Sequence, residues 1–300
     1  VSFVAGEGVE EVSDYAFRAC KYVTNNWGGE ERIIIPRPEL KKVVLPNSVQ
    51  RIGKGAFYKC TSLSDFAIPQ KATDISEEAF YNCSSLISVN IPEGTTTINP
   101  STFYVCSSLR NITFPKSLTT ISNNAFRICA FQHLELPPTI KTIGDYAFYG
   151  CSELLSITIP DGVKAIGTSA FYGCTNLANI TIPDSVTLIG YSAFVDTAYY
   201  NNESNWESNV LYIGNHLVGA KPSISGDYEI KAGTKTIADL AFINCKNLTN
   251  ITIPNSVITL GENPFSGCKN LTNITIPDSV SSIGNEIFNA CEKLESITVD

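Results

Sequence analysis

Residues 165–186 read AIGTSAFYGCTNLANITIPDSV, and this stretch decides the fold because its pattern returns along the chain. Its cysteine, Cys174, ends the segment AFYGC. Similar segments end at four other cysteines: AFYKC at Cys60, AFYNC at Cys83, AFYGC at Cys151 and AFINC at Cys245. A cysteine with fixed neighbours could be a metal ligand, half of a disulfide, a nucleophile or a packing residue. The choice among these roles largely decides the class of function.

The phenylalanine of these segments gives the period of the repeat. Eleven aligned phenylalanines define eleven repeats: Phe17, Phe57, Phe80, Phe103, Phe126, Phe148, Phe171, Phe194, Phe242, Phe265 and Phe288. Most steps are 23 residues and one is 22, but the step after Phe17 is 40 and the step after Phe194 is 48. A cysteine follows the phenylalanine by three residues in ten repeats, with Thr197 as the exception. All ten cysteines therefore occupy one position of the repeat.

Each unit predicts a strand, a turn and a compact corner. The alternation in ITIP, as at residues 180–183, predicts a half-buried strand that ends at the proline, and PDSV is typical of a turn. A second apolar pair precedes a glycine such as Gly167, which we expect to take a positive φ at the corner. Ala, Phe and Cys at one-turn spacing predict a helical or 3₁₀ turn. A unit this short cannot bury its own apolar side, so the units must stack.

The recurring pattern LxxIxIPxxVxxIGxxAFxxC resembles the leucine-rich repeats of the BspA-like family. The resemblance covers nearly the whole chain except two inserts, at about residues 21–39 and 195–236. It implies a leucine-rich-repeat horseshoe or solenoid, α/β by convention but mainly parallel β with short helical or 3₁₀ turns. About eleven repeats would form one domain over residues 1–300. Members of this family are typically bacterial surface or secreted proteins that act in adhesion, so the resemblance implies a secreted or cell-surface location and no enzymatic activity.

The bulk composition excludes several classes of partner. A net charge of −8 and a pI of about 4.9 argue against nucleic acid, which basic patches recognise, and against an electrostatic grip on anionic lipid. No apolar run approaches the roughly 20 residues of a membrane span. The chain begins VSFVAGEGVEEV and ends in ESITVD without a polar capping repeat, so we expect it to be a piece of a larger protein.

Packing accounts best for the cysteines. In stacked repeats they would stand about 5 Å apart in one column. This separation allows a disulfide, but parallel side chains suit bridging poorly. The sequence has no CxxC motif, which paired metal ligands favour, and a nucleophile would not be needed ten times. We therefore expect buried free thiols, no disulfides and no bound metal, with disulfides as the main alternative.

The outward positions of the strands form a polar row that could bind a ligand. The middle residues of the IxI motifs include four threonines that we take as candidate ligand contacts: Thr158, Thr181, Thr252 and Thr275. A second polar column, with Asn179 and Asn250 among its members, precedes it. One interpretation is that these residues are only solvated side chains that suit a strand. The alternative is a concave polar surface for a protein or glycan, which solenoids commonly present.

Both tryptophans lie in the inserts, Trp27 in the first and Trp206 in the second. The second insert also carries Tyr199, Tyr200 and Tyr212, which with Trp206 form our candidate aromatic contact site. They are the only local concentration of aromatic residues that we expect outside the core columns. The segment VLYIGNHLVG predicts a β-hairpin around Gly214-Asn215, and we expect it to project from the stack. Alternatively, these aromatics only cover the coil that they interrupt.

No motif predicts catalysis. The chain has two histidines, His133 in a predicted strand and His216 in the predicted hairpin, and no GxSxG, HExxH, Walker or GxGxxG pattern. We therefore expect no enzyme, no cofactor, and a monomeric surface or secreted module that recognises a host protein, a matrix component or a glycan. The alternative is a structural spacer or scaffold region of a larger surface protein, with no ligand of its own.

Overall fold

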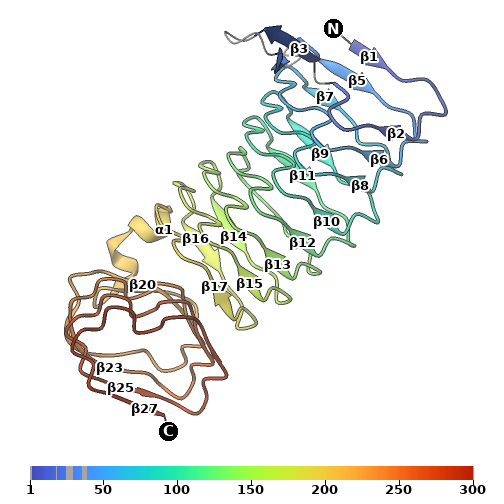
Figure 1. Ribbon diagram of the computed structural model, residues 1–300. Coiled ribbons are helices and arrows are strands. Elements are labelled where there is room, and N and C mark those ends of the chain that lie inside the picture. Colours follow the sequence, from blue (N-terminus) through green and yellow to red (C-terminus); the bar gives the residue numbers. More distant parts are fainter. Residues whose placement is uncertain (1, 18, 25–29, 36–38, 300) are drawn as a thin grey trace.

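The chain folds into a stack of coils, one coil per repeat. The computed structural model describes residues 2–17, 19–24, 30–35 and 39–299, with side chains described outside residues 18–38. Figure 1 shows the coils following one another from the N-terminal end to β17 (Leu188–Ile189), and then a second run of coils seen nearly end-on. The stack therefore changes direction between the two runs, and the termini lie at opposite ends.

The IxI motifs form the first row of strands, as predicted. Its members pair in parallel and are β1 (Ser2–Val4), β5 (Lys42–Val44), β7 (Asp65–Phe66), β9 (Ser88–Asn90), β11 (Asn111–Thr113), β14 (Ser156–Thr158), β16 (Asn179–Thr181), β21 (Ser225–Glu229), β23 (Asn247–Thr252), β25 (Asn273–Ile276) and β27 (Ser296–Val299). In β14 the isoleucine is buried while Thr158 is exposed. The row breaks into four sheets, at β7/β9, at β11/β14 and at β16/β21.

The apolar pair before the corner forms a second parallel row. Its strands have two residues each and are β2 (Glu11–Val12), β6 (Arg51–Ile52), β8 (Asp74–Ile75), β10 (Thr97–Ile98), β12 (Thr120–Ile121), β13 (Thr142–Ile143), β15 (Ala165–Ile166), β17, β22 (Thr236–Ile237), β24 (Thr259–Leu260) and β26 (Ser282–Ile283). The register pairs each isoleucine with its equivalent, for example Ile143 with Ile166. This register keeps the apolar side chains of successive coils in line.

The corner is a third hydrogen-bonded row and not a helical turn, contrary to the sequence prediction. Around Phe171, the amides of Ser169, Phe171 and Gly173 donate to the next repeat, while the residues between them close local turns. Ser169 and Gly173 have φ values of 51° and 70°. Every second amide of this corner therefore points to the neighbouring coil, which a 3₁₀ helix cannot do because its amides all bond within the turn.

The predicted aromatic spine is confirmed. The rings of consecutive repeats stack from Phe17 to Phe194 and again from Phe242 to Phe288, with centroid distances from 4.9 Å for Phe17–Phe57 to 5.9 Å for Phe265–Phe288. Phe148 is fully buried between Phe126 and Phe171. One continuous cluster of buried residues runs through the described part of the chain, so the repeats share a single core.

The nine described cysteines, which exclude Cys20, form no disulfide with one another, and eight of them are buried. Their thiols make a contact that the sequence did not predict. The Sγ of Cys174 donates to the carbonyl oxygen of Phe148 in the preceding repeat at 3.2 Å, and Cys151 does the same to Phe126. A small, weakly polar side chain therefore fills the core and bonds to a buried carbonyl. The packing interpretation of the recurring cysteine is confirmed for these residues.

The recurring glycine before the corner is needed for close approach and not for a positive φ. The positive-φ glycines include Gly150 and Gly173 but not Gly167 or Gly190. A Cβ on Gly167 would lie 2.5 Å from the backbone nitrogen of Asp145 in the preceding coil. The predicted positive φ at Gly167 is therefore wrong. A side chain is excluded there because adjacent coils touch at the backbone.

The inserts are partly regular. In the first, β3 (Ala19–Thr24) and β4 (Glu30–Ile35) form an antiparallel hairpin, and Trp27 lies outside the described residues. The second contains α1 (Ala198–Asn201), a 3₁₀ turn (Glu203–Asn205), β18 (Trp206–Glu207), β19 (Val210–Ile213) and β20 (His216–Ala220). Because β21 pairs in parallel with β23, residues 225–236 already follow the repeat, which differs from the predicted boundary at 236.

The predicted hairpin exists as β19 and β20, but it does not project from the stack. All four residues of β19 are buried, and β20 joins the second row by pairing in parallel with β22. In most other repeats, the strand of the second row pairs with the strand of the preceding repeat, so β22 would pair with β17. Here β20 occupies that position beside β22. The amide of Asp239 still reaches the carbonyl of Ile189, at 3.0 Å, so the two runs of coils stay in contact.

The fifth repeat loses its strand. It has one residue fewer than the others, and Phe131, fully buried with its edge toward Phe126, takes the place of the usual leucine. Residues 132–136 have no strand conformation, so the prediction that His133 lies in a strand is wrong. The carbonyl of Gln132 still accepts from the amide of Leu155 at 3.1 Å, but residues 133–136 form no backbone hydrogen bond to any described residue, and the first row breaks between β11 and β14.

Candidate ligand-binding sites

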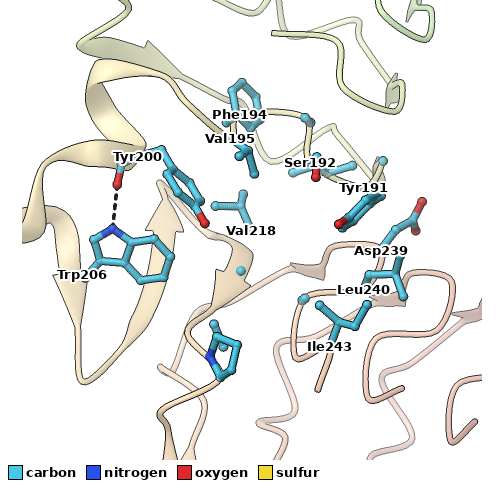
Figure 2. A pocket seen from close by; sticks show the side chains of 17 residues that line it. Tyr191, Ser192, Phe194, Val195, Tyr200, Trp206, Val218, Asp239, Leu240 and Ile243 are labelled. Carbon is cyan, nitrogen blue, oxygen red and sulfur yellow. Dashed lines mark hydrogen bonds between the residues drawn. The ribbon is translucent and has the colours of Figure 1, made fainter. Parts of the chain in front are cut away.

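A pocket of about 260 Å³ opens where the two runs of coils meet, and we call it the junction pocket. Figure 2 shows two sides of its lining: Tyr200 and Trp206 from the insert, and Tyr191, Asp239 and Leu240 from the regular coils. Tyr191 is 44% exposed and belongs to the last coil of the first run. The site therefore combines aromatic and apolar walls with one carboxylate, a composition usual for small binding sites.

Trp206 is held in place by its neighbours. Its indole nitrogen donates to the carbonyl of Tyr200 at 2.7 Å, and the two rings meet edge to face with centroids 5.1 Å apart. The ammonium of Lys221 lies 4.7 Å from the Trp206 ring centroid and forms an ion pair with Glu203. The ring is therefore fixed before any ligand arrives. Since its N–H group is already bonded, it can offer a partner only its aromatic surface.

Asp239 supplies the charge of the junction pocket. Burial raises the pKa of this carboxyl, although the backbone amide of Glu262, which donates to Oδ1 at 2.7 Å, partly counteracts this. The same amide contact occurs in other repeats, for example between Asp145 and the amide of Thr168. Asp239 therefore both ties two coils together and places a carboxylate beside the aromatic rings.

The other two predicted aromatic contacts, Tyr199 and Tyr212, anchor the insert. The Tyr199 hydroxyl donates to the carbonyl of Tyr212 at 2.9 Å. Tyr212 is 6% exposed, and its hydroxyl lies 2.9 Å from that of Tyr228. Tyr212 offers almost no surface to a ligand, so its place in the predicted contact site is not supported by its geometry. Of the four aromatics, Tyr200 and Trp206 are the two that line the pocket.

The predicted threonine row lies on one exposed face. Thr158, Thr181, Thr252 and Thr275 are all exposed, and parallel pairing puts Thr158 beside Thr181 and Thr252 beside Thr275. The row is not continuous, because the insert separates its two halves and the break at the fifth repeat precedes Thr158. The row thus consists of short polar patches instead of one uninterrupted platform.

A second aromatic surface was missed. In five repeats the residue after the core phenylalanine is a tyrosine, and these half-exposed tyrosines form a ladder, with ring centroids 4.7 Å apart for Tyr58–Tyr81 and Tyr81–Tyr104. The Arg127 guanidinium continues it, 4.3 Å from the Tyr149 ring centroid. The insert is therefore not the only concentration of aromatics outside the core. The repeated AFY motif carried this signal, since a tyrosine at a fixed position must stack on its copy in the next coil.

His216 is a buried titratable group next to the junction. Its Nε2 lies 3.1 Å from the carbonyl oxygen of Pro183, so Nε2 carries the proton and Nδ1 is left without a partner. Burial lowers the pKa of this imidazole below 6.5, with the Pro183 contact and Asp184 acting in the opposite direction. The histidine ties β20 to the first run of coils in its neutral form.

Among residues 2–17, 19–24, 30–35 and 39–299, no three His, Cys, Asp or Glu side chains are grouped as a metal site would require. No helix in this part of the chain combines the length and apolar character needed to cross a membrane. Burial raises the pKa of the thiols, to about 12 for Cys106 and Cys151, which opposes the thiolate form that a nucleophile needs.

Similar folds are known from bacterial proteins. A leucine-rich repeat protein from Bacteroides ovatus ATCC 8483 is 23% identical, with 93% of this chain and 92% of that chain covered and a TM-score of 0.52. A leucine-rich cell surface protein from Faecalibacterium prausnitzii A2-165 is 24% identical over 100% of this chain and 87% of that chain, with a TM-score of 0.40. The first of these likenesses supports the fold. Among curated proteins, none matches this chain significantly.

The sequence itself matches the BspA type leucine-rich repeat region, in 6 copies, over residues 37–155, 119–226 and 226–300. These ranges include every complete coil after the first insert. Proteins of this repeat type and fold are typically non-catalytic, and leucine-rich repeat proteins generally bind other proteins. With its stacked parallel strands and its eleven repeats, this chain belongs to the BspA-type leucine-rich repeat family.

Proposed function

We propose that this chain is a cell-surface or secreted binding module that recognises a protein, a matrix component or a glycan through the junction pocket. One observation carries the proposal: the residues that depart from the repeat pattern, Tyr200 and Trp206, line a pocket together with Tyr191 and Asp239. The repeated residues suffice to build the stack. The insert adds ordered aromatic surface where the first run of coils meets the second.

The composition of the junction pocket favours binding over mere coverage of the coil. An aromatic anchor can contribute about 2 kcal/mol or more to a complex, whereas one hydrogen bond to a hydrated threonine contributes about 0.5–1.5 kcal/mol. The Trp206 ring is already fixed by Tyr200 and Lys221, so binding would immobilise little additional side chain. Asp239 adds a directional acceptor for a hydroxyl or amide group of the ligand.

A screen on immobilised matrix proteins and glycans tests the proposal. We expect at least one saturable interaction that is weakened in the Trp206→Ala variant. Asn111→Ala is a suitable control, because Asn111 is exposed in β11 of the first run and does not line the junction pocket. The alternative, a spacer without a ligand, predicts no saturable binding to any surface, and that result would contradict the proposal.

A further inference from the structure

The break at the fifth repeat leaves a second hollow, which we call the strand-face groove. It measures about 640 Å³, within the range of about 300–1,000 Å³ that is usual for ligand sites. Its lining comes from the strandless segment on one side and from β14 with the turn that follows it on the other. The residues that matter here are His133, Glu135, Ser156, Thr158 and Asp161. The groove lies on the exposed threonine face, away from the junction pocket.

The backbone along this groove has unused hydrogen-bonding capacity. No backbone amide or carbonyl of residues 133–136 forms a hydrogen bond in the described structure, whereas the equivalent residues of β14 pair with β16. β11 and β14 each have a strand partner on one side only. Backbone groups at a strand edge bind water or pair with another strand, so this edge can accept an extended chain.

The charge of the groove restricts what such a chain can carry. Glu135 and Asp161 are exposed, and neither forms an ion pair with a described residue. No lysine or arginine lines the groove. The local potential therefore favours a cationic side chain and opposes an acidic one. No Phe, Tyr or Trp ring is present on which a sugar could stack.

We propose that the strand-face groove binds an extended peptide segment of a partner protein that carries a lysine or arginine. The backbone of the segment pairs with the free groups of residues 133–136 and the edge of β14. Its basic side chain lies between the carboxylates of Glu135 and Asp161. Unpaired strand edges are used in this way when a peptide adds a strand to a sheet. This inference goes beyond the proposed function, because it assigns a second site with its own class of ligand.

Fluorescence anisotropy with defined peptides tests this assignment. The probe is a labelled, acetylated and amidated peptide of alternating threonine and valine with one central lysine. We expect it to bind more tightly than the same peptide with central glutamate. Glu135→Gln and Asp161→Asn should each weaken it by about threefold to fivefold, the effect of a partly exposed ion pair. Asp278→Asn is the matched control, because Asp278 has the same turn position as Asp161 in another repeat.

A modified peptide and one protein variant separate strand pairing in this groove from binding elsewhere on the protein. A lysine peptide with alternate backbone nitrogens methylated should not bind, since it cannot pair as a strand. Trp206→Ala should leave peptide binding unchanged, so failure of the groove and failure of the junction pocket are distinguishable. Equal binding of the lysine and glutamate peptides, unimpaired binding of the methylated peptide, or no binding of the lysine peptide would each overturn the proposal. Displacement of the lysine peptide by the oligosaccharide maltohexaose would also overturn the proposal, because the groove would then be a sugar site.

Discussion

Replacing Phe148 by alanine tests how the stack is held together. The Phe148 ring is fully buried, and its centroid lies 5.5 Å from that of Phe126 and 5.3 Å from that of Phe171. Truncating a buried phenylalanine costs about 3–5 kcal/mol of unfolding free energy through lost burial and the cavity left behind. Two stacked neighbours are lost at once, so we expect the upper half of this range.

Tyr149 provides the matched comparison, because it is the next residue and belongs to the half-exposed ladder. Its ring stacks on Tyr172 at 5.0 Å and lies under the Arg127 guanidinium. One aromatic pair contributes about 0.5–1.5 kcal/mol, and one exposed cation–π contact contributes about 0.5–1 kcal/mol. Tyr149→Ala should therefore cost about 1–2.5 kcal/mol, clearly less than Phe148→Ala.

Urea unfolding followed by circular dichroism and by tyrosine fluorescence measures both changes. Two probes are needed, because repeat arrays do not always unfold in one step. We expect both probes to shift to lower urea in Phe148→Ala, and to shift less in Tyr149→Ala. Equal losses for the two variants would refute the distinction between a stabilising core spine and a surface ladder. A Phe148→Ala loss below about 1 kcal/mol would refute the burial argument itself.

Three further predictions concern the thiols, the buried histidine and the close-packed glycine. Titration with a thiol reagent should find almost no reactive cysteine in the native protein and close to ten in the unfolded, unreduced protein, and a near-zero count after unfolding would indicate disulfides. Because the folded pKa of His216 lies below 6.5, the unfolded chain gains a proton first as the pH falls, so unfolding free energy should drop below pH 6.5 and should drop less in His216→Gln. Equal pH profiles of the two proteins would contradict this. Gly167→Val should cost about 1–3 kcal/mol by overpacking against the backbone of Asp145, and an unchanged urea midpoint would contradict the close contact.

The stack and its core could be predicted because both depend on periodic features. The strand alternation, the phenylalanine spine and the buried cysteines all recur at one position of the unit, so each copy reinforces the same inference. Interactions between neighbouring repeats were harder to predict from the sequence. The Sγ contact of Cys174 to Phe148 and the amide row around Phe171 join different repeats, and the sequence of one unit does not show which atoms of its neighbour it meets.

The candidate sites were predicted only in part, because they arise where the period fails. The aromatic composition of the insert predicted Tyr200 and Trp206 as ligand contacts, and both line the junction pocket, but their contact with a ligand stays a prediction. It could not separate them from Tyr212, since the direction of each side chain depends on how β19 enters the second row. The strand-face groove depends on one missing residue and on Phe131, whose effect on the backbone is decided by packing and not by local propensity.

The most direct test of the account is the affinity of the junction pocket for whichever ligand the binding screen identifies. Isothermal titration calorimetry should show that Tyr200→Ala and Trp206→Ala each weaken binding by at least about tenfold, which is about 1.4 kcal/mol. Thr252→Ala and Thr275→Ala, on the exposed threonine face, should change the affinity little, and all four variants should keep a melting temperature close to that of the native protein. Contradiction would come from unchanged affinity in both aromatic variants, or from aromatic variants that unfold without a separate loss of affinity.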